Sequence, residues 1–378
     1  MIKLHKWRGI LALIVVFAIA LTSTVIFSPR MEAQTAPKTP TTELRGIWLT
    51  NIDSDVIFSR NNIIDAVNRL DKLNFNTIYP TVWQGGYTLY PSAVAKQVFG
   101  KSIDPSPGLQ DRDILKEIIA QSHKKGIAVI PWFEFGFMAP AESELARLHP
   151  EWLARRRDGS TIWKEGTHDR VWLNPFHEEV QKFILDLILE IVNNYDIDGI
   201  QFDDHFGLPV EFGYEPQTVL MYRWRADKIN DFMGRISRAI KSRKQKCIIS
   251  LSPNPLHFAL PAHLQDWFTW ERRGYIEELI VQVYRSDIKR FNAELEREEV
   301  KLAKKHIPTA IGILTGLKNS SIPLQQIQEQ VQEVRNRNFA GVSFFFYESL
   351  SSWAKETPEQ RNSALQEFFP AKMQRPPV

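Results

Sequence analysis

The chain has 378 residues, of which 43% are hydrophobic and 24% charged, and its formal net charge is +3. These proportions are typical of a globular protein, and so mild a positive charge gives no reason to expect a nucleic-acid partner. The single cysteine, Cys247, excludes an intramolecular disulfide.

The N-terminal segment resembles an export signal. Lys3, Lys6 and Arg8 precede an apolar run over 10–27, and a Thr- and Pro-rich stretch follows. This pattern predicts a signal peptide or an N-terminal membrane anchor over residues 1–33 and a flexible linker over 34–43. We therefore expect the body to be exported to the periplasm or cell envelope, either released or held at the inner membrane by this segment alone.

From residue 44 onwards the chain repeats a short apolar strand, a polar loop and an amphipathic helix. Strands are expected over 44–50, 76–83, 127–135, 198–206, 247–253, 279–284, 309–314 and 341–347. Helices are expected over 61–73, 113–125, 180–194, 219–241, 288–305, 324–336 and 359–369, with 254–274 irregular or weakly helical. Eight such units predict a (β/α)8 TIM barrel with long βα loops over 44–370, followed by a disordered tail over 371–378. A doubly wound sheet is disfavoured because no phosphate-binding glycine pattern follows the first strand.

The stretch DGIQFDDHF at 198–206 ends an apolar strand with two carboxylates and a histidine. Side chains alternate between the two faces of a strand, so Gln201 and Asp203 share the face opposite Ile200 and Phe202. In barrel enzymes the carboxyl ends of the strands carry the catalytic groups. The other interpretation is an Asp pair that caps a helix or pairs with an arginine.

The predicted strand ends bring acids and aromatic residues to one mouth. They are Asp53, Trp83, Trp132, Glu134, Asp203, Asp204, His205, Asn254, Gln282, Tyr284, Tyr347 and Glu348. Paired carboxylates between aromatic walls are typical of glycoside hydrolysis, in which one carboxyl group protonates the leaving oxygen and the other attacks or activates water.

Three carboxylates are the candidate catalysts. Asp203 is the candidate nucleophile or base, and its alternative role is a buried salt-bridged acid. Glu134, between two phenylalanines, is the candidate general acid, because desolvation raises the pKa of a carboxyl group. Glu348 competes with it for that role.

The remaining candidates are predicted to bind the substrate. Trp83 and Trp132 are the expected stacking platforms, and a second group supplies polar and aromatic contacts. That group comprises Gln201, Asp204, His205, Asn254, Gln282, Tyr284 and Tyr347.

A metal site formed by Asp203, Asp204 and His205 is the competing interpretation of this stretch. Three adjacent residues are not expected to converge from one strand, whose side chains alternate. We therefore expect neither a metal nor another cofactor.

Four segments resemble the bacterial glycosyl-hydrolase-like family 10: RGIWLTNI, TIYPTVW, PWFEF and DGIQFDDHF. The resemblance implies an exported or lipid-anchored (β/α)8 protein related to glycosidases, some of which act on the glycan strands of bacterial cell walls. The family's DGIHFDD-like signature falls on 198–204, with Gln201 where a histidine is more usual. This difference implies hydrogen bonding rather than proton transfer at Gln201.

A more distant likeness to the alpha-amylase class places that class's nucleophile on Asp203. The fifth strand, IISLSPNP, lacks the acid glutamate of that class, so the acid must come from elsewhere.

We therefore expect a monomeric, exported glycoside hydrolase that acts on a polysaccharide, with peptidoglycan glycan strands as the favoured substrate. A catalytically inactive glycan-binding protein of the cell envelope is the alternative. A metal-dependent deacetylase that uses Asp203, Asp204 and His205 is a third hypothesis.

Overall fold

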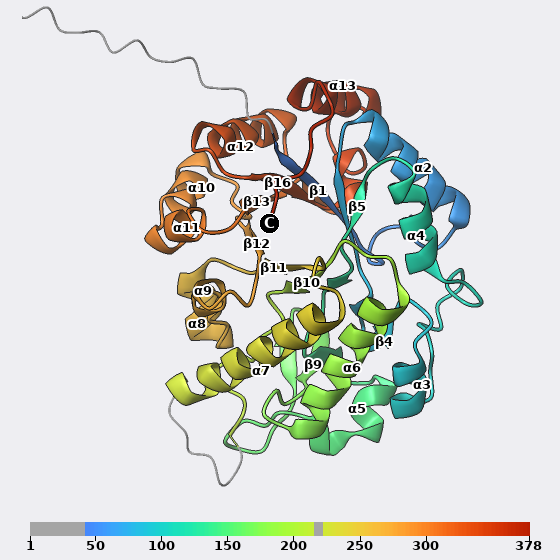
Figure 1. Cartoon of the computed structure of the whole chain (residues 1–378), viewed down its shortest axis with the longest axis vertical. Helices are drawn as coiled ribbons and strands as arrows, with labels where there is room; N and C mark the ends of the chain where they lie inside the picture. The colour runs from blue at the N-terminus through green and yellow to red at the C-terminus, as the bar shows by residue number, and fades with distance from the viewer. Residues whose placement is uncertain (1–41, 215–221) are drawn as a thin grey trace, which may run out of the picture. The chain divides into compact units, whose positions relative to one another are not determined.

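The structure is a computed structural model that describes residues 42–214 and 222–378 (Figure 1). The predicted signal or anchor segment and nearly all of the predicted linker lie outside these residues. Among the helices within these two ranges, none combines the length and the apolar character needed to cross a bilayer.

The centre of the fold is a parallel sheet in the order β5-β2-β1-β16-β13-β12-β11-β10-β6. Its strands are β1 (Leu44–Leu49), β2 (Thr77–Pro80), β5 (Ala128–Val129), β6 (Trp132–Phe133), β10 (Gly199–Asp203), β11 (Ile248–Ser252), β12 (Glu278–Gln282), β13 (Thr309–Leu314) and β16 (Gly341–Phe345). β5 pairs with β2 while β6 pairs with β10, and only two residues separate β5 from β6. These two segments are the halves of the predicted third strand, so the sheet closes into a barrel with eight strand positions.

Pro131 explains why the third strand is divided. A proline has no N–H group to donate to the ladder, yet its carbonyl still accepts from the Gln201 N–H at 2.8 Å. On the other side, the Ile130 N–H donates to the Ile78 carbonyl at 3.0 Å. The ring of hydrogen bonds therefore continues through the interruption, as the predicted (β/α)8 architecture requires.

Helices surround the barrel (Figure 1). They are α2 (Arg60–Lys72), α4 (Ile114–His123), α6 (Glu178–Asn194), α7 (Tyr222–Arg243), α8 (Leu256–His263), α9 (Trp267–Arg272), α10 (Ile288–Leu295), α11 (Glu298–Ala303), α12 (Leu324–Asn336) and α13 (Pro358–Phe368). α2 is representative, because Ile63, Val67 and Leu70 recur at helical spacing and are buried against the sheet. The single helix expected over 288–305 is two helices, α10 and α11, whereas the region 254–274, expected to be irregular or weakly helical, contains the short helices α8 and α9.

Apolar side chains form two separate clusters. The larger fills the space between the sheet and the surrounding helices. The smaller lies inside the barrel and includes Trp48, Tyr79, Trp132 and Phe346. The interior is therefore a packed core, and only its upper end, where the strands finish, is open to a ligand.

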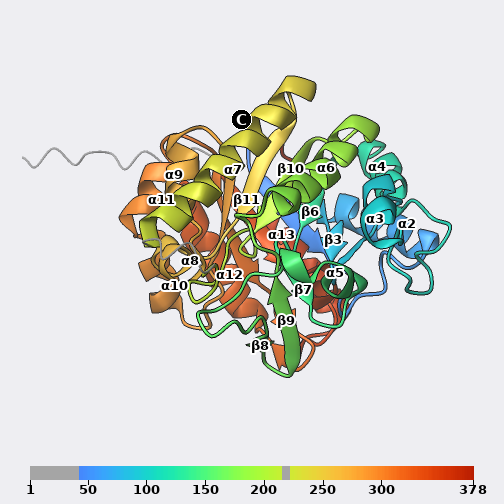
Figure 2. The ribbon, with the colours of Figure 1, turned by 90° about the horizontal axis from the view of Figure 1, so that it is seen from below.

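The long excursion after β6 is an ordered structure of its own. It contains β7 (Met138–Pro140), α5 (Glu144–Leu148), the 3₁₀ turn η1 (Pro150–Trp152), β8 (Trp163–Glu165) and β9 (His168–Trp172). The three strands form an antiparallel sheet in the order β7-β9-β8, and Figure 2 shows β8 and β9 extending away from the barrel. Smaller elements in other loops are β3 (Trp83–Gln84), β4 (Tyr87–Thr88), α3 (Ala93–Phe99), β14 (Gly316–Leu317), β15 (Ser320–Ser321) and the 3₁₀ turn η2 (Tyr347–Leu350).

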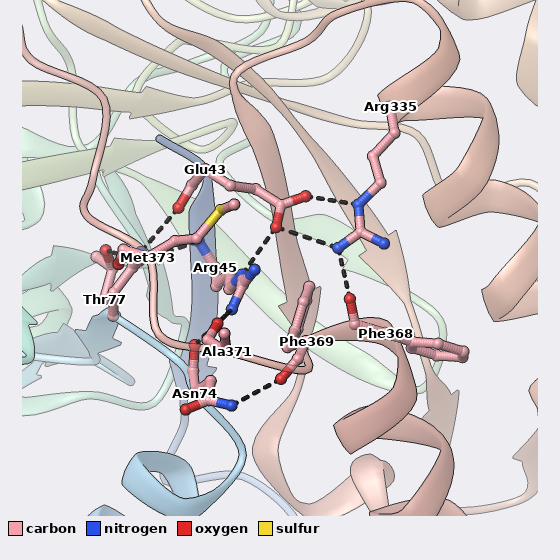
Figure 3. Close-up of polar contacts among 10 residues, drawn as sticks. Glu43, Arg45, Asn74, Thr77, Arg335, Phe368, Phe369, Ala371 and Met373 are labelled. Carbon is pink, nitrogen blue, oxygen red and sulfur yellow. Dashed lines mark hydrogen bonds and ion pairs between the residues drawn. The ribbon is translucent and has the colours of Figure 1, made fainter. Parts of the chain in front are cut away.

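A charged network ties both ends of the described chain to the base of the barrel (Figure 3). The Glu43 carboxylate accepts from Arg45 Nε at 2.8 Å and from Arg335 Nε at 2.7 Å. Arg335 also donates to the Phe368 carbonyl, and Asn74 donates to the Phe369 carbonyl at 2.7 Å. The network therefore joins β1, α12 and the end of α13.

The C-terminal segment differs from the disordered tail predicted over 371–378. Gln374 bridges to Thr42, and the Met373 carbonyl accepts a hydrogen bond at 3.1 Å. Arg375 forms an ion pair with Glu278, which is only 1% exposed. This contact could not be predicted from the sequence, because Glu278 begins a strand 97 residues before Arg375.

Candidate active site

Asp203 ends β10 with its carboxylate facing the mouth of the barrel, and it is 3% exposed. Its Oδ1 atom accepts from Gln282 Nε2 at 2.6 Å, and Gln282 ends β12 two strands away. Burial and then the negative charge of Asp204 raise the pKa of Asp203 to about 7.

Asp204 and His205 continue the chain around the same mouth. Asp204 Oδ2 accepts from Asn254 Nδ2 at 2.6 Å, while its Oδ1 lies 3.1 Å from His205 Nδ1. Burial by itself lowers the pKa of the His205 imidazole, but the charges of Asp204 and Asp203 outweigh it and raise the pKa to about 10. His205 is therefore a cation near neutral pH, held beside two acids.

Glu134 comes from the neighbouring strand position. Trp132 is in register with Gln201 in the parallel pair β6–β10, so Glu134 and Asp203, two residues further on, stand at the same level. Neighbouring strands lie about 4.8 Å apart. Glu134 Oε2 accepts from Thr81 Oγ1 at 3.1 Å, and burial followed by the negative charge of Asp203 raises the pKa of Glu134 to about 8.

The loop after Glu134 contacts the DDH stretch directly. His205 Nδ1 lies 3.1 Å from the Glu134 carbonyl, and the Phe137 N–H donates to the His205 carbonyl at 3.2 Å. Gly136 permits this approach, since its φ is +50° and a Cβ atom there would lie 2.5 Å from the His205 carbonyl oxygen. The two strand ends are therefore fastened together around the acids.

The expectation that Asp203, Asp204 and His205 do not converge is wrong. Their candidate ligand atoms all lie within 4.8 Å of one another, because the chain turns after β10 and alternation no longer holds. Each of the three side chains nevertheless has a protein partner already, in Gln282, Asn254 and the Glu134 carbonyl. Convergence alone therefore does not assign a metal to this cluster.

A cleft of about 550 Å³ opens above these groups. Glu134 and His205 line it together with Phe135, Phe345 and Phe346. The other lining residues are Thr50, Ile52, Asp53, Gln84, Gly85, Glu165, His168, Arg170 and Leu317. This volume lies within the range of small-ligand sites, and aromatic walls with a few charged groups suit a sugar ring.

Tyr284 lies near the candidate catalytic carboxyl groups. Burial and the charges of Asp203, Asp204 and Glu134 all raise the pKa of its hydroxyl well above the ordinary value, so it remains a neutral hydrogen-bonding group. Its ring lies 5.7 Å from that of Phe345, which lines the cleft. The structure therefore places Tyr284 with Asp203, Asp204, His205, Glu134, Asn254 and Gln282 at the mouth.

Two aromatic residues predicted to bind substrate face the other way. Trp83 is fully buried in the outer core, where its Nε1 donates to the Gly136 carbonyl at 2.9 Å. Tyr347 also belongs to the outer core, with the Arg69 guanidinium 5.3 Å from its ring centre. The predicted roles of both are wrong, because these residues follow the regular strands and alternation no longer fixes their direction.

Two further candidates lie below the mouth, inside the barrel. Gln201 is fully buried, with its amide oxygen accepting from Trp48 Nε1 at 2.7 Å and its amide nitrogen donating to Ser250 Oγ at 3.0 Å. Trp132 is 3% exposed and packs 6.2 Å from Trp48 and 6.3 Å from Phe345. Both support the floor of the site, and neither lines the cleft.

Glu348, the competing acid, is held elsewhere on the rim. Its Oε1 accepts from Ser54 Oγ at 2.9 Å, and the residue is not among those lining the cleft. The structure brings Glu134, and not Glu348, to the neighbourhood of Asp203.

Sequence reasoning missed several residues around the acids. Thr81 binds Glu134, and Gln265 donates to the Asp203 carbonyl at 2.8 Å. The Trp172 ring lies 5.9 Å from both His205 and His263. Thr81 could have been predicted at the mouth, because it follows β2 by one residue. Gln265 and His263 come from a segment without any recognisable motif.

A closed parallel barrel with a pair of neighbouring carboxyl groups at the carboxyl ends of its strands is the architecture of many glycoside hydrolases. Solved structures share this fold. The glycoside hydrolase domain of PgaB (BpsB) from Bordetella bronchiseptica superposes with a TM-score of 0.60 at 10% identity, over 81% of this chain and 94% of that one. The catalytic domain of a beta-amylase from Paenibacillus polymyxa gives 0.58 at 10% identity, over 87% and 98%. At these identities the likeness concerns the fold alone.

The chain belongs to the family Glycosyl hydrolase-like 10, whose sequence profile matches residues 43–333. The glycosyl hydrolase DigH of Escherichia coli K12 is 25% identical over 293 residues, which cover 64% of this chain and 65% of DigH. The glycosyl hydrolase YngK of Bacillus subtilis is 24% identical over 236 residues, covering 56% of this chain and 45% of YngK. The match therefore spans less than two thirds of the length of each relative.

Proposed function

We propose that this protein is an exported glycoside hydrolase that cleaves the glycan strands of peptidoglycan. The observation that carries the catalytic part is the placement of Glu134 beside Asp203 at the barrel mouth, where burial raises the pKa of both carboxyl groups. The export part is supported by the basic and apolar N-terminal sequence, and the choice of glycan by the family resemblance of the strand motifs.

The surroundings of the two carboxyl groups assign the roles. Burial and the negative charge of Asp203 raise the pKa of Glu134 to about 8, which favours its protonated form, whereas Gln282 donates a hydrogen bond to the carboxylate of Asp203, whose pKa is about 7. Between these values Glu134 can protonate the glycosidic oxygen while the Asp203 carboxylate attacks the anomeric carbon or activates water. Gln282 holds Asp203 in position, and Tyr284 is available to a sugar hydroxyl.

The test is to incubate the purified protein with peptidoglycan glycan strands and with α- and β-linked glucans, beside a hydrolase of known activity. Cleavage of the peptidoglycan strands by the wild type, abolished in Asp203→Asn, is the expected result. If the known hydrolase works and the wild type cuts none of these glycans, the hydrolase proposal fails. Glycan binding without turnover, equal in wild type and Asp203→Asn, would instead identify an inactive binding protein.

Export can be tested independently of activity. Fractionation of cells that express the full chain should recover the protein in the periplasm or envelope, and deletion of residues 1–33 should retain it in the cytoplasm. Equal distribution of the two forms would contradict the predicted signal or anchor.

A further inference from the structure

Arg170 stands in the wall of the cleft, and its side chain is fixed from two sides. It lies on β9, the central strand of the β7-β9-β8 sheet, and lines the cleft together with Glu134 and His205. Its Nε donates to Glu165 Oε2 on β8 at 2.8 Å. Its guanidinium carbon lies 5.2 Å from the centre of the Phe135 ring. These two contacts hold the guanidinium plane in one orientation.

The two Nη atoms of Arg170 are free to bind a ligand, as far as the described residues show. Within residues 42–214 and 222–378, neither Nη atom of Arg170 has a hydrogen-bond partner, and the side chain is 16% exposed. Glu165 occupies the Nε edge only. The plane of this guanidinium is fixed, and its two Nη atoms can donate hydrogen bonds to a ligand. Two such donors match the two oxygens of a carboxylate, so a bidentate interaction is possible.

Two other charged side chains that line the cleft, Asp53 and His205, have charged partners. Asp53 forms an ion pair with Lys318 at 3.0 Å. His205 lies between the carboxylates of Asp203 and Asp204, at 3.9 and 3.1 Å. Arg170 therefore adds to the cleft wall two N–H-bearing nitrogens that have no partner among the described residues.

The Phe135 ring contacts both Arg170 and His205. Phe135 follows Glu134 in the chain, and its ring lies 5.9 Å from that of His205 and has the Arg170 guanidinium over it at 5.2 Å. A sugar bound at Glu134 would thus have its neighbour, or its own substituent, within reach of Arg170.

We propose that Arg170 is a specificity-determining residue that binds a carboxylate carried by the glycan beside the cleaved bond. The protein would accordingly prefer acidic glycans to neutral ones. The inference rests on the proposed glycosidase function of the same cleft, and it adds the chemical class of the substrate and the residue that selects it.

The test compares each glycan with its own methyl ester, which removes the negative charge and leaves the chain unchanged. One arm uses peptidoglycan glycan with free lactyl carboxylates, and a second uses an oligouronide. Wild type should lose about tenfold or more in kcat/KM on esterification of at least one of them, which is the loss expected for a charge-assisted pair. Arg170→Met should cleave acid and ester at similar rates, and Arg170→Lys should retain part of the preference.

Lys164→Met is the matched control. Lys164 is on the same hairpin, is 71% exposed and pairs with Asp169 outside the cleft, so this variant removes one positive charge without touching the site. It should keep the wild-type preference. If it loses the preference as fully as Arg170→Met, the effect is one of general charge and the proposal fails.

Binding separates this inference from the proposed activity. Calorimetry with acid and ester forms of both glycans can be done on Asp203→Asn with and without Arg170→Met, and it needs no turnover. Selective binding of an acid form that depends on Arg170 supports the inference even if no cleavage is detected. Equal binding of acid and ester, or a preference that survives Arg170→Met, overturns it even if the wild type is an active hydrolase.

Discussion

Replacing Glu134 by glutamine tests the assignment of the general acid. The change keeps the shape of the side chain and removes the proton that the leaving oxygen needs. General acid catalysis contributes about 10²- to 10⁴-fold to the rate, so kcat should fall by that amount on a natural glycan. On an aryl glycoside with a good leaving group, which needs no protonation, the loss should be less than about tenfold.

The pH profile supplies a second and sharper readout. With pKa values of about 7 for Asp203 and about 8 for Glu134, wild-type kcat/KM should be bell-shaped with its maximum midway between them. Glu134→Gln should abolish the alkaline limb and leave the acid limb, because only the group that must remain protonated has been removed.

Glu348→Gln is the matched control for this experiment. Glu348 is bonded to Ser54 and does not line the cleft, so the variant should keep both limbs of the profile. The assignment is refuted if Glu134→Gln retains an alkaline limb near pH 8 or if Glu348→Gln is the variant that loses it.

Three further substitutions probe the surroundings. Gln282→Ala removes the 2.6 Å hydrogen bond to the Asp203 carboxylate, so the pKa of Asp203 should rise and the acid limb of kcat/KM should move roughly half a unit to a unit upward. Arg375→Met leaves the buried Glu278 without its cation, and urea denaturation should show a loss of about 3 kcal/mol in the free energy of unfolding. Trp83→Phe removes the bond to the Gly136 carbonyl, and it should cost about 1 kcal/mol in stability while KM is unchanged.

For each of these three substitutions a different outcome would contradict the prediction. An acid limb that stays in place in Gln282→Ala would mean that Gln282 does not stabilise the Asp203 carboxylate. The exposed pair Lys182–Asp186 serves as the stability control, since Lys182→Met should change stability by less than about 0.5 kcal/mol. A similar small change in Arg375→Met would mean that the C-terminal segment does not support the barrel. A raised KM in Trp83→Phe would restore Trp83 as a substrate contact.

The regular elements of this protein follow from local sequence. Apolar residues at helical spacing, as in α2, and short apolar runs bounded by polar loops identified the strands and most of the helices. The position of Asp203 at the barrel mouth could also be predicted, because side chains alternate between the two faces of β10 and Gln201 and Asp203 lie on its inner face. Wherever a side chain belongs to a regular strand, its direction was available from the sequence.

The predictions of side-chain direction failed for residues that follow the regular strands. Trp83 and Tyr347 come after β2 and β16, and His205 comes after β10, so alternation could not tell which of them faces the cleft. The hydrogen-bond partners of the two aspartates could not be predicted either, because they are distant in the chain. Gln282 is 79 residues from Asp203, and Asn254 is 50 residues from Asp204.

The sequence by itself therefore determined the barrel, the strand that carries Asp203 and the identity of the nearby glutamate. Only the tertiary structure decided which side chains surround them. It brought the Phe135 ring into contact with both Arg170 and His205, placed Trp83 in the outer core and paired Arg375 with Glu278. The physical reason is that the periodicity of a strand or helix depends on residues close together in the sequence. Burial, charge pairing and the resulting pKa values depend on segments that meet only when the barrel closes.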